Sequence, residues 1–419
     1  MAKINIYKIR GNFTILFPFI LIFISEVMMH LNPPLAPVLK VCAVIYMLIY
    51  AFFGNTFHTT FIFFLVFFIP IFFYGIIHSF NLSAGISEGV RYLFPVSILM
   101  YSFAIRTRFR LLICAFIIFV LINDFWQIIN YINWMRGEIQ WFYLKDLYGN
   151  PKYNMSSGIL RATGIVAFFG LFGFMNLIAF FNTRKYYNGK KKKLLLAIFI
   201  ISLFLSFSYK SIGTFLVLLF IQHKNKLRFF QVIGSLFVVL FLIMPKLLKS
   251  MGESVVFRVE QYITKGDSAR AESYRVMFDD LADFNLFGRG IGSFGGPSSV
   301  TYNSPVYPDT NFNWYYTIDL KTTDTFFPHL FVEVGFIGGL LYLLIILSPI
   351  FFRWPKDKFE IVVVIYVSLF LDALFSYSLN NIAFLALSLS FLYPLFYFNG
   401  DNISSNLMLE STKQNKKQD

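Results

Sequence analysis

Apolar residues fall in long blocks along the chain, and short basic or polar segments separate the blocks. Twelve blocks are candidate transmembrane helices: residues 13–30, 35–53, 57–79, 88–105, 110–132, 158–182, 193–208, 211–222, 228–248, 325–352, 358–376 and 380–398. Most approach the ~20 residues that a helix needs to cross the hydrocarbon core of a bilayer. The pattern therefore predicts an all-α, polytopic membrane protein with about twelve transmembrane helices.

The composition supports this prediction. Of the 419 residues, 57% are hydrophobic and 14% are charged, whereas about a quarter of a soluble domain is charged. Lys and Arg (36) outnumber Asp and Glu (22), which gives a net charge of +14. The basic residues lie in short segments between apolar blocks, so the charge indicates membrane topology and not nucleic-acid binding.

The basic segments also predict the orientation of the chain. They lie before the first block and at residues 106–110, 184–193, 223–228, 353–358 and 413–417. Cytoplasmic loops are enriched in Lys and Arg. All these segments share one side only if the block 193–222 crosses the membrane twice, so we expect two short helices there and cytoplasmic termini.

Lys210 lies near the outer face in this topology, where the two short helices meet at residues 206–211. An ionisable residue within an apolar block is a candidate functional residue. The alternative is a lysine that extends its charge to water without binding a ligand.

One long polar interval, residues 249–324, separates the ninth and tenth blocks. Ser268 is a plausible N-cap, and apolar residues at helical spacing predict an amphipathic helix over 268–284 with Arg270 in its first turn. We expect helices one to nine in 1–248, an outer cap in 249–324, helices ten to twelve in 325–398 and a disordered cytoplasmic tail in 399–419.

The glycine-spaced run Gly288-Arg-Gly290-Ile-Gly292 is similar to a dinucleotide-binding fingerprint. That motif needs a preceding strand and a following helix, whereas this run follows a predicted helix. We interpret it as a helix stop followed by a tight turn that requires positive φ.

The chain resembles the O-antigen polymerase and ligase superfamily in the combination of four features. They are Arg270 early in an outer-loop helix, the run from Asn285 to Phe294, the segment Thr323-Asp324-Thr325-Phe326, and Glu333-Val-Gly335-Phe-Ile-Gly338 on the next helix. The resemblance implies a glycosyltransferase of the bacterial inner membrane that uses glycans linked to undecaprenyl diphosphate on the periplasmic side. It also implies membrane lipid and a chain-length regulator protein as partners.

Two departures from the family pattern bear on the function. The family often has arginine where this chain has Lys210, which keeps the charge but lacks the bidentate fork. Ligases of the superfamily have a catalytic histidine at the position of Asp324, so an aspartate there favours a polymerase. His329 lies about one turn further on, and it either takes the place of that histidine or packs in the core.

Transfer of a glycan from a lipid diphosphate needs cations that bind the leaving diphosphate and a group that accepts the proton of the attacking hydroxyl. The candidates for diphosphate binding are Arg270, then Lys210, then Arg275 and Arg258, and the candidates for the base are Asp324, with Glu272 weaker, and His329. We expect neither a metal nor another cofactor, because the loop has no acidic or His–Asp cluster with convincing ligand spacing. Three aromatic residues are candidates for stacking on sugar rings or for simple interfacial anchoring: Tyr302, Trp314 and Tyr315.

The sequence thus favours a polymerase that moves the growing glycan from undecaprenyl diphosphate onto a lipid-linked repeat unit. One alternative is a ligase that transfers finished polymer to lipid A core. An alternative of another class is a flippase for lipid-linked oligosaccharide, in which we would expect paired halves with ionisable residues near mid-membrane.

Overall fold

The computed structural model describes residues 6–54, 58–138, 161–166, 168–223, 268–314 and 323–398, with short segments between 144 and 160 and scattered positions between 225 and 260. In the first part of the chain the helices are α1 (Ile6–Leu31), α2 (Leu35–Phe53), α3 (Thr59–Ile77), α4 (Leu82–Ala104), α5 (Phe109–Met135), α6 (Phe169–Tyr186), α7 (Lys192–Leu205) and α8 (Tyr209–Gln222). Two small antiparallel ladders pair β1 (Leu144–Lys145) with β2 (Pro151–Lys152) and β3 (Met155–Ser156) with β4 (Ile159–Leu160).

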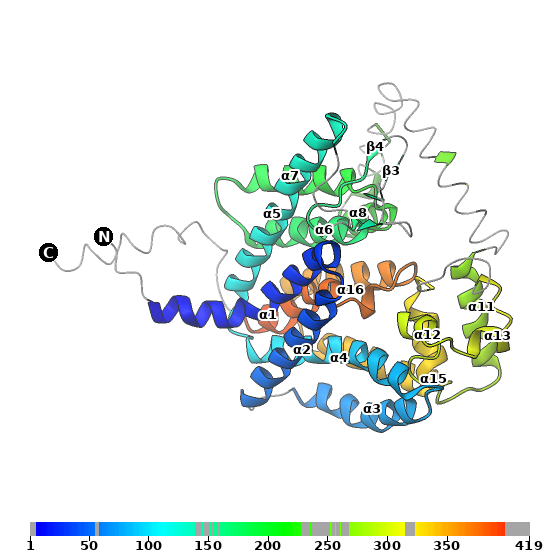
Figure 1. The fold of residues 1–419 in the computed structure, drawn as a ribbon. Coiled ribbons are helices and arrows are strands. Elements are labelled where there is room, and N and C mark those ends of the chain that lie inside the picture. The colour runs from blue at the N-terminus through cyan, green and yellow to red at the C-terminus, as the bar shows by residue number, and fades with distance from the viewer. Residues whose placement is uncertain are drawn as a thin grey trace.

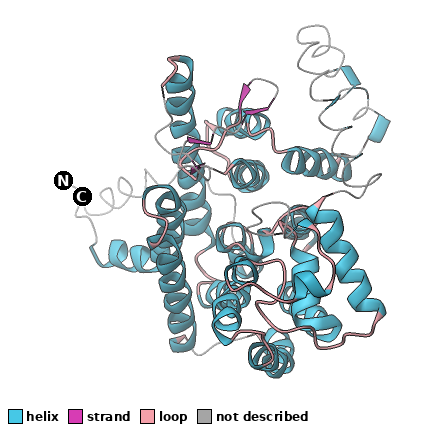
Figure 2. Cartoon of the chain, turned by 45° about the vertical axis from the view of Figure 1, so that its right-hand side comes forward, coloured by secondary structure: helices cyan, strands magenta, loops and turns pink. Residues whose placement is uncertain are grey.

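The second part of the chain contains longer and shorter helices. They are α11 (Ala269–Ala282), α12 (Pro297–Thr301), α13 (Val306–Asp309), α15 (Phe326–Leu347), the 3-10 helix η2 (Ser348–Phe351), α16 (Lys356–Ala373), η3 (Ser378–Asn380), α17 (Ile382–Ala386), η4 (Leu389–Phe391) and α18 (Leu392–Tyr397). Cartoon colours in Figure 2 show that helices dominate the described chain.

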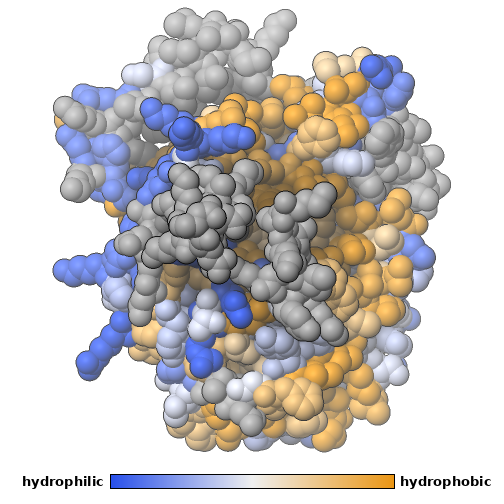
Figure 3. Space-filling view, turned by 90° about the vertical axis from the view of Figure 1, so that its left-hand side faces the viewer, coloured by the Kyte–Doolittle hydropathy of each residue, from blue (hydrophilic) through white to orange (hydrophobic). Residues whose placement is uncertain are grey.

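Five of the described helical segments are long and apolar enough to cross a membrane: Gly11–Leu31, Leu35–Phe53, Thr59–Ile77, Phe109–Met135 and Phe326–Phe351. This confirms the predicted all-α membrane protein in its class. The number of twelve spans stays a prediction, and the predicted block 228–248 lies almost entirely outside the described residues. Hydrophobic residues cover much of the right-hand part of the face in Figure 3.

The predicted division of block 193–222 is confirmed, because α7 ends and α8 begins around Ser206–Ser208. Phe207 takes the left-handed conformation with φ of 46°, which reverses the chain. Ser208 then caps α8 by accepting from Ser211 N. A helix N-terminus at this point leaves Lys210 in the first turn of α8.

Two predicted spans differ from single straight helices. In block 158–182, residues 161–166 are not helical and α6 begins only at Phe169. The last block, 380–398, is divided into η3, α17, η4 and α18. Asn381 caps α17 by accepting from Ala383 N, and Ser388, with φ of −130°, separates α17 from η4. Local side-chain hydrogen bonds to the backbone therefore compete with a continuous helix in this segment.

The helices α11, α12 and α13 gather at one end of the bundle, opposite the end where α1 begins (Figure 1). The predicted amphipathic helix over 268–284 is confirmed as α11, with Ser268 as its N-cap. α11 packs against α15, and together with the loop to Phe312 it encloses a small hydrophobic core of its own, made by Val276, Met277, Phe294, Val306, Tyr307, Phe312 and Val332. We call residues 268–314 the cap.

Candidate functional site

The glycine-rich segment of the cap is bonded to a kink in α15. Gly335 has φ of 70° and ψ of −175°, which interrupts the helix. The interruption frees the carbonyls of Val332 and Glu333, which accept from Arg289 N (2.8 Å) and Gly290 N (3.0 Å). The kink therefore fixes where the glycine segment meets the transmembrane helix.

Gly288, Gly290 and Gly292 all have positive φ, which confirms the predicted tight turn. The predicted helix stop at this run is wrong, because α11 already ends at Ala282 and Phe284 takes φ of 55°. A Cβ added at Gly290, where φ is 99°, would lie 2.6 Å from the carbonyl oxygen of His78. Glycine is required there both for the conformation and for the close backbone approach. Ile291 N continues the contact by donating to Gly75 O at 2.8 Å.

Arg289 fastens this segment to α11 through a bidentate ion pair with Asp280. Arg289 Nε lies 2.9 Å from Asp280 Oδ2, and Nη2 lies 2.6 Å from Oδ1. The hydrogen bonds to Asp280 raise the pKa of Arg289 further above its usual value. The charged pair is therefore structural, and it joins α11 to the turn above α15.

His329 lies in a buried cluster that the glycine segment completes. Its Nδ1 is 2.6 Å from the carbonyl oxygen of Phe294. A carbonyl can only accept, so Nδ1 carries the hydrogen and Nε2 is the acceptor nitrogen of the neutral ring. Nε2 lies 2.9 Å from Tyr377 Oη, 3.4 Å from Glu333 Oε2 and 3.6 Å from Glu88 Oε1.

The two carboxylates of this cluster have no solvent-exposed surface in their side chains, and each has several partners. Glu88 Oε1 accepts from Tyr377 Oη at 2.5 Å and lies 3.4 Å from Arg91 Nε. Glu333 accepts from Tyr92 Oη at 2.9 Å and from Phe294 N at 3.2 Å. We call the side chains of Glu88, Arg91, Tyr92, His329, Glu333 and Tyr377 the ionisable cluster.

A cavity of about 670 Å³ adjoins the ionisable cluster. The turn between α1 and α2, the helix α4 and residues 376–384 contribute most of its wall. Its polar lining residues are Lys40, Ser87, Arg91, Asp324, Ser376, Tyr377, Ser378, Asn380 and Asn381. Arg91 and Tyr377 belong to both the cavity wall and the ionisable cluster, and a volume of this size can hold a drug-sized polar group.

Asp324 and Arg270, the first candidates for base and diphosphate binding, lie together at the edge of this cavity. Arg270 Nη2 is 3.3 Å from Asp324 Oδ2. Asp324 has φ of 55°, and its side chain is 61% exposed. An aspartate tolerates the left-handed conformation better than most residues, so this turn points a carboxylate toward the N-terminus of α11.

Lys210 makes a second ion pair close by. Its Nζ lies 3.0 Å from Asp372 Oδ1 on α16, and Arg270 and Asp324 are near enough to interact with it electrostatically. Asp372 also accepts from Ser376 Oγ, and Ser376 lines the cavity. The structure thus brings Lys210, Arg270 and Asp324 into one group, as the sequence predicts.

Glu272 and Arg275 have structural partners instead. Glu272 Oε1 accepts from Asn313 N at 3.1 Å, and Arg275 Nη2 donates to Thr310 O at 2.9 Å. Arg275 also pairs with Asp279 at 3.0 Å. These bonds hold the loop after α13 against α11, and neither residue lines the cavity.

The aromatic candidates for stacking on sugar rings lie in different parts of the molecule. Trp314 packs against the hydrophobic core of the cap, and Tyr302 is 39% exposed at the end of α12. Neither lines the cavity beside Asp324. The candidates Tyr315 and Arg258 lie outside the described residues.

Sequence reasoning missed Glu88, Arg91, Tyr377 and Asp372. Glu88 and Arg91 are the charged residues of the predicted span 88–105 and stand three positions apart, which places them on one helix face. The rule that flagged Lys210 as an ionisable residue in an apolar block also applies to them and to Asp372. For Tyr377 the sequence carries no comparable signal.

A second polar cluster lies around α5 and supports non-helical backbone. Gln127 Oε1 accepts from Thr163 N and Gly164 N, both at 2.9 Å. Asn123 Oδ1 accepts from Ile165 N at 2.8 Å. These side chains satisfy backbone amides of a segment that would be costly without partners inside a bilayer. With Asp124, Asn130 and Asn176 we call them the amide cluster.

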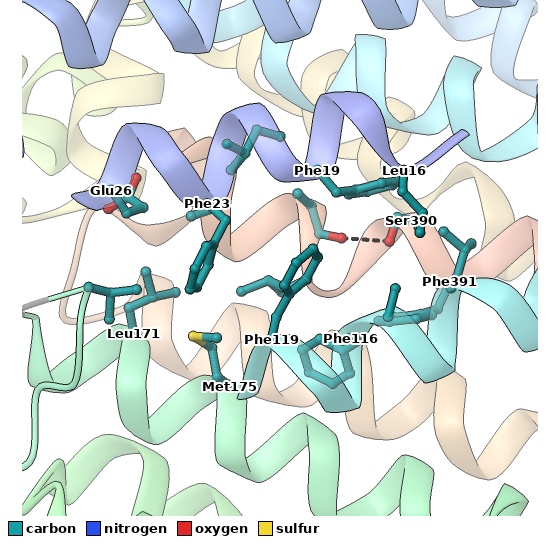
Figure 4. A pocket seen from close by; sticks show the side chains of 17 residues that line it. Leu16, Phe19, Phe23, Glu26, Phe116, Phe119, Leu171, Met175, Ser390 and Phe391 are labelled. Atoms are coloured by element: carbon teal, nitrogen blue, oxygen red, sulfur yellow. Dashed lines mark hydrogen bonds between the residues drawn. The ribbon is translucent and has the colours of Figure 1, made fainter. Parts of the chain in front are cut away.

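A smaller cavity of about 40 Å³ lies among α1, α5, α6 and α17 (Figure 4). Phe23 and Phe119 stack there with ring centroids 5.2 Å apart. Glu26 lies at one end of the cavity in Figure 4, and it pairs with Lys40 at 2.8 Å. The remaining lining is mostly apolar, so this cavity is a packing feature of the bundle.

No family model matches the sequence, and no characterised protein matches it significantly. Fold and site geometry therefore define the class to which the chain can be assigned, an all-α membrane protein with a polar cap.

Proposed function

We propose that the protein is a membrane glycosyltransferase that polymerises O-antigen or a related surface polysaccharide. It transfers the growing glycan from undecaprenyl diphosphate onto a lipid-linked repeat unit at the periplasmic face of the bacterial inner membrane. The observation that carries the proposal is the cavity of about 670 Å³ whose wall comes mostly from α1, α2, α4 and residues 376–384, with Pro297 from the cap, and includes Lys40, Arg91 and Asp324.

The distribution of cations supports diphosphate binding. Arg91 and Lys40 line the cavity, and Arg270 pairs with the lining residue Asp324. Lys210 pairs with Asp372, which in turn accepts from the lining residue Ser376. Each of these cations is paired with a carboxylate, so an incoming diphosphate exchanges one anionic partner for another. Arginine binds two phosphate oxygens at once, which makes Arg270 the principal ligand in this proposal.

The apolar surroundings support a lipid-linked substrate. Helices α1, α2 and α4 supply apolar side chains to the same cavity, including Met29, Val90 and Phe94. A polyprenyl chain requires apolar surroundings and its diphosphate requires cations, so one cavity with both surfaces fits an amphipathic donor. Under this proposal the cap is periplasmic and both termini are cytoplasmic.

The ligase remains the second candidate within the class, and the aspartate at position 324 favours the polymerase over it. A flippase would need a substrate site that opens to each side of the membrane in turn. Arg270 and Asp324 form an ion pair and both interact electrostatically with Lys210, and this single group favours chemistry at one site.

Gel analysis of surface polysaccharide tests the proposal in cells that carry Arg270→Ala or Asp324→Ala at matched protein levels. A polymerase predicts single repeat units with the ladder lost. Arg184→Ala is the matched control, because Arg184 lies on α6 and donates to Gln222 outside the cavity. A complete ladder in both site variants contradicts the assignment, and loss of all repeat units indicates a flippase.

A further inference from the structure

A short polar segment, residues 376–381, connects α16 with α17 and forms part of the wall of the cavity of about 670 Å³. Its sequence is Ser-Tyr-Ser-Leu-Asn-Asn. The five polar residues all line the cavity, whereas Leu379 packs in the hydrophobic core of the bundle. We call residues 376–381 the polar segment.

Three members of the polar segment have partners within the protein that hold it in place. Ser376 Oγ donates to a carbonyl of α16 at 3.0 Å. Tyr377 Oη donates to Glu88 Oε1 on α4 at 2.5 Å. Asn381 Oδ1 caps α17 by accepting from its backbone at 2.9 Å. The segment is therefore fastened to three helices, and the positions of its other side chains are fixed with it.

Ser378 and Asn380 differ from these three residues, because their polar side-chain atoms have no hydrogen-bond partner in the part of the chain that the structure describes. This applies to Ser378 Oγ and to both Oδ1 and Nδ2 of Asn380. The two residues are only 2% and 1% exposed, so bulk water does not replace the missing partners. Among the described residues, only these two combine such atoms with a place in the wall of this cavity.

Buried polar groups normally have partners, so a hydroxyl and an amide without them at a cavity wall are suited to a polar ligand. The lipid-linked substrate has three chemically different parts. Its polyprenyl chain has no hydrogen-bonding group, and its diphosphate only accepts, so neither can pair with Asn380 Oδ1. Sugar hydroxyls both donate and accept, and two neighbouring hydroxyls can pair with the oxygen and the nitrogen of one amide.

We infer that Asn380 and Ser378 form a sugar-binding subsite, which holds hydroxyls of the sugar attached to the lipid diphosphate. This inference rests on the proposed function. The cations Lys40 and Arg91 line the same cavity. Because the first sugar is bonded directly to the diphosphate, a diphosphate bound by these cations brings that sugar into the cavity as well. A cavity of this size can hold a drug-sized group.

The subsite makes Asn380 a specificity-determining residue. A pocket that is built to hydrogen-bond a hydroxyl discriminates strongly against an analogue without it, because the polar groups of the pocket are then left unpaired. Cations at the diphosphate carry no such information, since every lipid-linked unit has the same diphosphate. Recognition of the repeat unit therefore comes from the polar segment and not from Lys40 or Arg91.

The first test measures how tightly two lipids displace labelled undecaprenyl diphosphate from the purified protein in lipid nanodiscs on ice. One is the undecaprenyl-diphosphate-linked repeat unit, extracted from a polymerase-deficient strain, and the other is unlabelled undecaprenyl diphosphate. Asn380→Leu is expected to raise the Kd of the repeat-unit lipid about tenfold, because two hydrogen bonds of ordinary strength are lost. Ser378→Ala should raise it about threefold. The Kd of undecaprenyl diphosphate should stay within about twofold in both variants, because it carries no sugar.

Thermal stability separates this role from a structural one. Leucine is close to asparagine in shape and removes an amide that has no partners, so Asn380→Leu should leave the unfolding temperature unchanged or raise it. Asn182→Leu is the matched control. Asn182 lies on α6, is also 1% exposed and also has an unpaired Oδ1, but it does not line the cavity. Both Kd values should be unchanged in that variant.

Steady-state elongation then identifies which substrate the subsite holds. KM is measured separately for the lipid-linked polymer and for the lipid-linked repeat unit. The substrate whose KM rises about tenfold in Asn380→Leu, with kcat within about twofold, is the one whose sugar occupies the subsite. No rise in either KM overturns the inference.

Two binding results also overturn the inference. One is an Asn380→Leu variant that binds the repeat-unit lipid as tightly as the parent protein. The other is an equal loss of affinity for both lipids, because the amide would then act on the diphosphate site or on the fold. A parent protein that binds the repeat-unit lipid more tightly than undecaprenyl diphosphate, yet lengthens no glycan, would instead refute the proposed function and leave the sugar-binding subsite standing.

Discussion

The bundle contains two buried polar clusters that are built from different side chains. The amide cluster of Asn123, Asp124, Gln127, Asn130 and Asn176 is mostly neutral. Three of its members bond to the backbone of residues 163–166, and Asp124 accepts from Asn176. The ionisable cluster bonds mainly side chain to side chain and shares two residues with the cavity wall.

The side-chain composition of each cluster indicates whether it supports the backbone or is suited to binding and proton transfer. Amides satisfy buried, non-helical backbone at low cost because they carry no charge. Two carboxylates, an arginine and a histidine are expensive to bury, so their position together against a cavity makes this cluster the candidate for binding or proton transfer. The contrast can be tested by changing one residue of each cluster in a comparable way.

The largest effect is expected from Gly290→Ala, which disrupts the glycine turn that supports the ionisable cluster. A Cβ would meet His78 O at 2.6 Å, and φ of 99° is strained for alanine. Backbone strain and the close contact cost about 1–3 kcal/mol each, or about 2–6 kcal/mol in sum. The folded fraction, measured by fluorescence-detected size exclusion after heating, should fall sharply.

Gly213→Ala is the control for this substitution, because Gly213 lies within α8 and a Cβ there meets nothing within 4 Å. Alanine should leave that variant as stable as the parent or slightly more stable. Equal thermal stability of the two variants would show that the glycine turn does not hold the cluster.

Glu88→Gln is the next most severe change, because it removes one charge and keeps the shape. Tyr377 can still donate to the amide oxygen, but Arg91 loses its carboxylate partner. We expect the rate of transfer to fall about 10²-fold, close to 2.7 kcal/mol, with normal folding. A normal rate would mean that the ionisable cluster serves stability alone.

Tyr131→Phe is expected to have a moderate effect that is confined to stability. Its hydroxyl donates to Leu160 O at 3.0 Å beside the amide cluster. Loss of one such bond costs about 0.5–1.5 kcal/mol. The unfolding temperature should fall while the rate per folded molecule stays that of the parent, and a large fall in rate would remove the distinction between the clusters.

Asp124→Asn should have the smallest effect and provides the direct counterpart of Glu88→Gln. Asp124 Oδ1 accepts from Asn176 Nδ2 at 2.9 Å, and an asparagine oxygen can accept the same bond. Transfer should be unchanged within about twofold. A loss as large as that of Glu88→Gln would place a functional charge in the amide cluster as well.

The fold class was accessible from the sequence because hydropathy and length alone indicate transmembrane helices. The break before Lys210 followed from charge, since basic segments flank a block too long for one helix. The irregular segment 161–166 was not predicted, because it depends on Gln127 and Asn123, which are distant in sequence. Hydropathy treats such amides only as weakly polar positions.

The candidate site was predictable in part for a similar reason. Arg270, Asp324 and Lys210 stand out locally, next to an N-cap, a helix start and a helix break, and the structure brings them together. Tyr377 acquires its position only from contacts 48 and 289 residues away, with His329 and Glu88. A tyrosine between two predicted helices carries no sign of those partners in its own sequence neighbourhood.

Reconstitution of the purified protein in liposomes with undecaprenyl-diphosphate-linked repeat units tests the central claim most directly. The measurement follows glycan length and released undecaprenyl diphosphate in the same sample. The proposal predicts one undecaprenyl diphosphate released for each linkage formed, in the absence of any other protein. Movement of the lipid-linked unit across the bilayer with no increase in glycan length would contradict it.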